Sequence, residues 1–192
     1  ALRVDRHRQP GPAQQAGACG PGQSVDPTQI PKDAVAGYSG DQLTNAAYIM
    51  NAASTLGLDR AAQIIGVMTA MGESSLRVVD HGDTAGPDSR GLFQQRDNGA
   101  WGSLADRMDP TISATNFFKA LERVDGWEAL PPTIAAHRVQ GNADPYHYEK
   151  FYDAAATVVG TLAGKGVTVC QSGYLVFPLN PGYQMTSNYG PR

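Results

Sequence analysis

Apolar residues recur at intervals of three and four along the middle of the chain, which predicts helices there. The first helix begins near Ser39 or Asp41, either of which can cap it, and stops at Gly57. Asp59 caps a second helix, which runs to about Glu73. Further helices are expected from Asp109-Pro110 to Leu121, from Pro131-Pro132 to Val139, and from Tyr148 to Leu162. No segment between residues 40 and 162 alternates with period two, so the fold class is mainly α.

The flanks of this helical region have a different composition. Residues 1–39 are rich in Pro, Gly and Gln without a period, and we interpret them as an extended N-terminal tail before a domain spanning 40–163. Residues 164–192 carry Gly, Pro, β-branched and aromatic residues, which predicts a linker and a short β-prone fragment of a second domain cut by the end of the chain. Because the opening ALRVDRHRQP contains no Met, we expect that a signal or an anchor was removed upstream.

A long irregular stretch, residues 74–100, separates the second and third helices. Such loops in compact domains are usually functional. It begins after Glu73, at the end of an apolar helix, and contains a Gly-Leu-Phe-Gln-Gln turn at 91–95. Two effects disfavour ionisation of a carboxyl at this place, which suits a general acid. One is the negative end of the helix dipole, and the other is desolvation by apolar neighbours such as Met68, Met71, Leu76 and Phe93. The alternative is a solvated residue at a fraying helix end.

The two ends of this stretch resemble a known family. Glu73-Ser74-Ser75, followed by Ser89-Arg90-Gly91-Leu92-Phe93-Gln94-Gln95, is similar to the lysozyme-like lytic transglycosylases, in which a helix ends in Glu-Ser and a Gly-Leu-(Met/Phe)-Gln turn follows. The resemblance implies a lysozyme-like helical domain with a long active-site loop. It also implies that Glu73 is the catalytic acid/base and that peptidoglycan glycan strands are the partner.

The glycan-binding residues expected from the motifs and from their chemistry are Ser74, Ser89, Gly91, Gln94, Gln95, Trp101, His137 and Gln140. Gly91 allows the backbone to approach a ligand, and either glutamine of the turn supplies a donor and an acceptor. Leu92 and Phe93 are expected in the core, as is Trp127. Trp101 either stacks on a sugar or packs in the core.

The family's third motif, Ala-Tyr-Asn, is replaced here by the segment 134–140, which lacks the Tyr and the Asn. Within it, His137 has three possible roles. It hydrogen-bonds a sugar, supports Glu73, or is a structural or surface residue.

Glycosidases usually employ a second carboxylate. The candidates are Asp80, Asp83, Asp88 and Asp97, all of which are equally compatible with turn formation. Because lytic transglycosylases of the resembled superfamily use a single Glu, we favour that mechanism over hydrolysis with a second Asp. The rival functions are a non-catalytic glycan-binding domain and a structural part of a phage tail or conjugation machine.

The tail carries a second resemblance. Phe177-Pro178-Leu179 and the segment 186–192 are similar to the opening of the lysostaphin-like zinc endopeptidases, whose zinc ligands lie downstream of the Gly-x-Arg that ends this chain. No zinc site and no other cofactor is therefore expected. The four histidines, His7, His81, His137 and His147, also lack a ligand spacing.

Composition and cysteine usage bear on partners and compartment. A net charge of −3 gives no electrostatic footprint for nucleic acid, and no apolar run reaches the ~20 residues of a membrane span. Cys19 and Cys170 flank the helical region, so we expect one disulfide; the alternative is two unrelated buried thiols. The disulfide favours an oxidising environment, so we expect the protein to be secreted, wall-associated or virion-associated. We also expect it to be a monomer.

Overall fold

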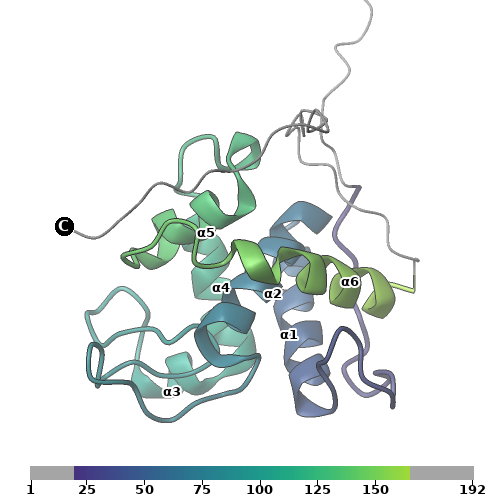
Figure 1. Ribbon diagram of the computed structural model, residues 1–192, viewed down its shortest axis with the longest axis horizontal. Coiled ribbons are helices and arrows are strands. Elements are labelled where there is room, and N and C mark those ends of the chain that lie inside the picture. The colour runs from purple at the N-terminus through teal and green to yellow at the C-terminus, as the bar shows by residue number, and fades with distance from the viewer. Residues whose placement is uncertain (1–19, 165–192) are drawn as a thin grey trace, which may run out of the picture.

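A computed structural model describes residues 20–164, and this part of the chain is mainly helical, as predicted (Figure 1). Its elements are α1 (Asp41–Thr55), α2 (Arg60–Ser74), α3 (Leu104–Met108), α4 (Pro110–Leu121), η1 (Trp127–Ala129), α5 (Pro132–Gln140), η2 (Glu149–Phe151) and α6 (Tyr152–Leu162). Extended pairing within these residues is limited to three isolated bridges.

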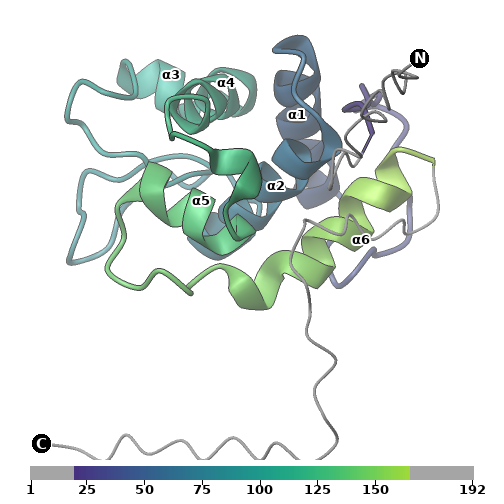
Figure 2. The same cartoon turned by 90° about the horizontal axis from the view of Figure 1, so that it is seen from above.

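Helix α2 is the central element of the core. Every residue from Ala62 to Met71 is buried, and α2 contacts α1, α4, α5 and α6, which surround it in both views (Figures 1 and 2). A helix that is apolar on all sides is stable only when it is enclosed in this way. The C-terminal end of α2 therefore emerges from a fixed scaffold, and the long loop that follows it lies at the edge of the molecule away from α6 (Figure 2).

Two of the predicted helix caps are confirmed, and the third is wrong. The Asp59 carboxylate accepts a hydrogen bond from the Ala62 N–H, and that of Asp109 accepts from two N–H groups of the first turn of α4. Neither Ser39 nor Asp41 caps α1. Gly40 occupies the N-cap position without a side-chain bond, and the Gln42 Oε1 reaches back to the Ser39 N–H at 3.3 Å instead.

Helix α3 is absent from the sequence prediction, because five residues are too few to show a period. It forms through a capping box, in which the Ser103 hydroxyl accepts from the Asp106 N–H and the Asp106 carboxylate accepts from the Ser103 N–H. The last predicted helix also begins later than expected, since a 3₁₀ turn over Glu149–Phe151 precedes α6.

The lead-in to α1 is irregular, as predicted, but it is fixed to the core along residues 20–39. Gln63 hydrogen-bonds both the N–H and the carbonyl of Gln23, and Asn51 does the same for Val25. Its apolar side chains pack against the buried cluster. The start of the predicted tail, the Cys19–Cys170 disulfide, the β-prone fragment and the endopeptidase-like segment all lie outside the described residues.

None of the helices between residues 20 and 164 combines the length and the apolar character needed to cross a lipid bilayer.

The packing of α2 makes one glycine sensitive to substitution. A Cβ on Gly66 would lie 2.5 Å from Phe118 Cζ and 2.9 Å from Ile49 Cγ2. Although Ala is the better helix former, we expect Gly66→Ala to lower the free energy of unfolding by about 1–3 kcal/mol through overpacking. Adding Phe118→Leu should give a combined loss smaller than the sum of the two single losses. Strict additivity in urea unfolding would contradict this packing account.

Candidate active site

The site is built around a hydrogen bond between residues that lie far apart in the sequence. The Tyr148 hydroxyl donates to Glu73 Oε1. Tyr148 is fully buried, whereas Glu73, in the last turn of α2, is half-buried. The apolar residues expected around the carboxyl, Met68, Met71, Leu76 and Phe93, are all in the core. The Glu73 carboxyl is therefore partly exposed at the surface, and the buried Tyr148 phenol hydrogen-bonds it from the protein interior.

The absence of a side chain at Gly72 allows this contact. A Cβ on Gly72 would lie 2.7 Å from Tyr148 Cδ1, so only glycine lets the ring lie against the last turn of α2. The neighbouring His147 ring packs edge-on against Tyr148, with centroids 4.9 Å apart, and its Nε2 lies 3.4 Å from the Gly72 carbonyl. The turn before α6 is thus fixed to the end of α2.

Tyr148 is a neutral donor. Burial raises the pKa of Tyr148 far above its ordinary value of 10.0, and the negative charge of Glu73 and the hydrogen bond to it raise that pKa further. A hydrogen bond with the Gln140 side chain acts in the opposite direction and is outweighed. The phenol therefore keeps its proton throughout the physiological range and always has a hydrogen to donate to Glu73.

The Gly-Leu-Phe-Gln-Gln turn lies directly against this site. Arg90 and Gln95 close the turn through paired backbone hydrogen bonds of 3.0 and 3.1 Å. The Ser74 hydroxyl donates to the Leu92 carbonyl at 2.7 Å, and the Gln140 Nε2 donates to the Phe93 carbonyl at 2.8 Å. Ser74 and Gln140, both expected to bind glycan, thus anchor the turn to α2 and α5.

Gly91 is required by packing within the protein. It has a φ of 77°, and a Cβ there would lie 1.9 Å from the Arg107 carbonyl oxygen. The close approach of the backbone to the end of α3 therefore requires glycine here, and the expected contact with a ligand stays a prediction. Leu92 and Phe93 are fully buried, which confirms the prediction that they anchor the turn.

The two glutamines of the turn are not equivalent. Gln95 is buried, and its Nε2 donates to the Ser113 carbonyl at 3.3 Å, so it faces the start of α4. Gln94 is half-buried, with its backbone in the left-handed region at φ 46° and its Nε2 3.3 Å from the Gly91 carbonyl. Of the two, Gln94 is the one with an amide accessible to a ligand. Ser89 is buried beside the turn.

The four aspartates considered as a second carboxylate mainly organise the loop. Asp83 accepts hydrogen bonds from the Ala85 and Gly86 N–H groups, as a turn-forming aspartate does. Asp88 accepts from the Asp97 N–H and from Arg96, and these two interactions lower the pKa of Asp88 to about 2. Asp80 is exposed beside His81. Within residues 20–164, none of the four forms a hydrogen bond or ion pair with Glu73.

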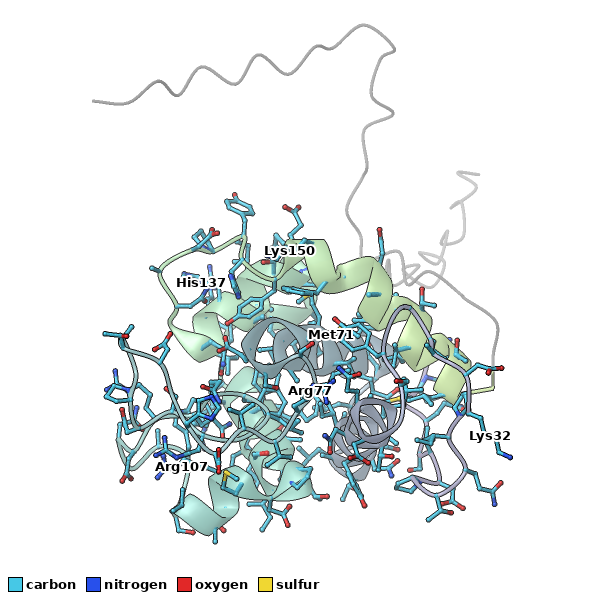
Figure 3. The ribbon with its side chains drawn as sticks, turned by 60° about the horizontal axis from the view of Figure 1, so that its bottom comes forward. Lys32, Met71, Arg77, Arg107, His137 and Lys150 are labelled. Carbon is cyan, nitrogen blue, oxygen red and sulfur yellow. The ribbon has the colours of Figure 1, made fainter. Side chains whose placement is uncertain are left out.

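A buried arginine that the sequence analysis missed holds the loop together. The Arg107 Nη1 donates to the carbonyls of Asp88 and Gln95, at 3.0 and 3.3 Å, and its Nη2 lies 3.3 Å from the Asp97 carboxylate. Figure 3 shows Arg107 on the loop side of the molecule, away from His137. Its position within an isolated five-residue helix gave no periodic signal.

Trp101 and His137 lie at the borders of the site. Trp101 is half-buried, and its carbonyl accepts from the Asn116 side chain at 3.2 Å, whereas Trp127 is in the core as predicted. The His137 Nδ1 lies 3.1 Å from the Asn142 Oδ1 near the end of α5. His137 does not hydrogen-bond Glu73, so the supporting role considered for it belongs to Tyr148.

No protein-family model matches the chain, and no curated protein sequence matches it. In the region 20–164, no three His, Cys, Asp or Glu side chains gather closely enough to hold a metal ion. The assignment of the candidate site therefore depends on the geometry around Glu73.

The raised pKa of Tyr148 predicts a pH dependence of stability. In the unfolded chain this tyrosine titrates near its ordinary value of 10.0, whereas in the folded protein it stays protonated. Its stabilising contribution is therefore complete below about pH 10 and is lost above it, by about 1.4 kcal/mol per pH unit. Urea unfolding between about pH 10 and pH 12 should show a shallower loss of stability in Tyr148→Phe than in the wild type.

Tyr146→Phe is the matched control, because Tyr146 is 61% exposed and two residues away. This variant should keep the wild-type slope. If Tyr148→Phe also keeps that slope, the phenol is not held in its neutral form by the fold.

Proposed function

We propose that this domain cleaves the glycan strands of peptidoglycan, at the bond between N-acetylmuramic acid and N-acetylglucosamine, with Glu73 as the acid and then the base. The observation that carries the proposal is the environment of Glu73. It is a half-buried carboxyl at the end of a buried helix, and Tyr148 is its one hydrogen-bond partner within residues 20–164. The resemblance of the Glu73-Ser74-Ser75 and 89–95 motifs to lysozyme-like lytic transglycosylases supplies the substrate class.

The hydrogen bond from Tyr148 determines which oxygen of Glu73 acts. Because the phenol donates to Oε1, the proton of a neutral Glu73 resides on Oε2, and this is the oxygen left to face a substrate. In the first step, Oε2 donates its proton to the glycosidic oxygen as the bond to C1 of the muramic acid breaks. Tyr148 stabilises the carboxylate that forms and cannot itself be deprotonated by it.

In the second step the same carboxylate removes a proton. It accepts the proton of the muramic acid C6 hydroxyl, whose oxygen attacks C1 and closes a 1,6-anhydro ring. The N-acetyl group of the substrate stabilises the positive charge at C1 between the steps. Glu73 ends protonated, as it began, so one carboxyl completes the cycle.

The arrangement of the aspartates favours this single-Glu mechanism over hydrolysis. An enzyme that retains or inverts configuration by hydrolysis usually places a second carboxylate across the cleaved bond. Asp83 and Asp88 are engaged in backbone hydrogen bonds of the loop, and Asp97 pairs with Arg107. The helices around α2 and the long loop after Glu73 support a lysozyme-like domain, which would act on the cell wall outside the cytoplasm or as part of a virion.

Replacing Glu73 tests the proposal. Glu73→Gln keeps the shape and can accept the Tyr148 hydrogen bond, but it can neither give nor take a proton, so turnover of purified peptidoglycan should fall by at least about 10²-fold. Mass spectrometry of the wild-type products should show 1,6-anhydro-muropeptides.

Glu122→Gln is the matched control, because it makes the same Glu-to-Gln change at an exposed residue that directly follows α4. It should retain activity. Reducing-end products that depend on Glu73 would replace the transglycosylase mechanism with hydrolysis. Binding of glycan without cleavage by the wild type would make the domain a non-catalytic binding module.

A further inference from the structure

The backbone that follows Glu73 is strained. Ser75 and Leu76 both have left-handed conformations, with φ of 55° and 59°. Residues with a Cβ adopt this conformation only at a cost in conformational energy, whereas glycine adopts it freely. Consecutive strained residues persist only where the surroundings hold them, and such places are frequently functional.

Two amide side chains from α1 hold this strained segment. The Gln42 Nε2 donates to the Ser75 carbonyl at 2.8 Å, and the Asn45 Nδ2 donates to the Leu76 carbonyl at 2.9 Å. Both amides are buried, and the Leu76 side chain is fully buried. The chain therefore leaves α2 along a single fixed path.

That path brings Arg77 to the surface next to the site. The Arg77 N–H lies 3.2 Å from the Ser74 carbonyl and 3.3 Å from the Ser74 hydroxyl, which itself bonds the Leu92 carbonyl. The backbone of Arg77 thus lies where the helix of Glu73 meets the turn at 91–95. Its side chain is exposed, and it projects near the centre of the face seen in Figure 3.

Arg77 differs from the arginines of the neighbouring loop in having no acceptor within the described part of the chain. The guanidinium of Arg90 donates to the carbonyls of Pro87 and Ser89, Arg96 pairs with Asp88, and Arg107 is buried against backbone carbonyls. A fixed backbone therefore presents an unpaired guanidinium four residues after the proposed acid in the sequence. Its planar fork matches a carboxylate.

We infer that Arg77 binds a carboxylate of the substrate strand and thereby favours muramic acid next to Glu73. This inference rests on the proposed function, in which the substrate bears carboxylates on alternate sugars. These carboxylates have two sources. In peptide-bearing strands the carboxylates belong to the peptide. After an amidase has removed the peptide, the free carboxylate is that of the lactyl group.

Binding measured in the Glu73→Gln background separates the inference from catalysis. Calorimetry uses three ligands: peptide-bearing strands, amidase-treated strands, and an uncharged N-acetylglucosamine oligomer. Adding Arg77→Gln should raise the Kd for a charged strand about five- to tenfold, leave the Kd for the uncharged oligomer unchanged, and reduce the salt dependence of binding. An effect on peptide-bearing strands assigns the contact to the peptide, and an effect on amidase-treated strands assigns it to the lactyl group.

Lys32→Gln is the control for the loss of one positive charge, because Lys32 lies on the lead-in to α1, at the right-hand edge of Figure 3. It should leave all three affinities unchanged. Equal weakening of all three ligands by Arg77→Gln, or no weakening, would overturn the inference. Absence of cleavage by the wild type would instead overturn the proposed function, and it would do so whatever the affinities are.

Discussion

The hydrogen bond from Tyr148 to Glu73 is the contact on which the rest of the site depends, and it exists because residue 72 has no side chain. Burying a phenol without a partner would cost free energy, and burying an unpaired carboxylate would cost more. Placing them together at the end of α2 satisfies the phenol and leaves Glu73 half-exposed. The same contact brings the turn before α6 against α2, so it serves the fold as well as the site.

Around that contact, buried polar side chains hold irregular backbone in place. Gln42 and Asn45 hold the strained residues after Glu73, Ser74 and Gln140 hold the turn at 91–95, and Arg107 holds the outer part of the loop. Each of these bonds joins a helix to a loop carbonyl. A loop fixed in this way can keep a carboxyl and its neighbours in one geometry, which is what positioning a reacting bond requires.

The helices were predictable from the sequence because their signals are local. The period of apolar residues located α1, α2, α4, α5 and α6, and Asp59 and Asp109 marked two of their starts. Glu73 was found as a candidate because a carboxylate at the end of an apolar helix is unusual, and the turn at 91–95 was found because of the resemblance.

The roles of the turn residues were harder to predict. Gly91 makes room for a carbonyl of Arg107, and Ser74 and Gln140 serve the protein itself, since a motif records which residues occur but not what they touch. Tyr148 gave no signal because its partner Glu73 lies 75 residues away in the sequence. Arg107 gave none because the five residues of α3 are too few to show a period.

The central claim is that the end of α2 presents Glu73 Oε2 to a glycosidic bond while Tyr148 holds Oε1. A crystal structure of the Glu73→Gln variant with a bound muramic acid-containing tetrasaccharide tests it most directly. The account predicts the side chain of residue 73 within hydrogen-bonding distance of a glycosidic oxygen, with the Tyr148 hydroxyl still on the opposite atom of that side chain. A glycan bound elsewhere on the domain, or a Tyr148 ring displaced from Gly72, would contradict it.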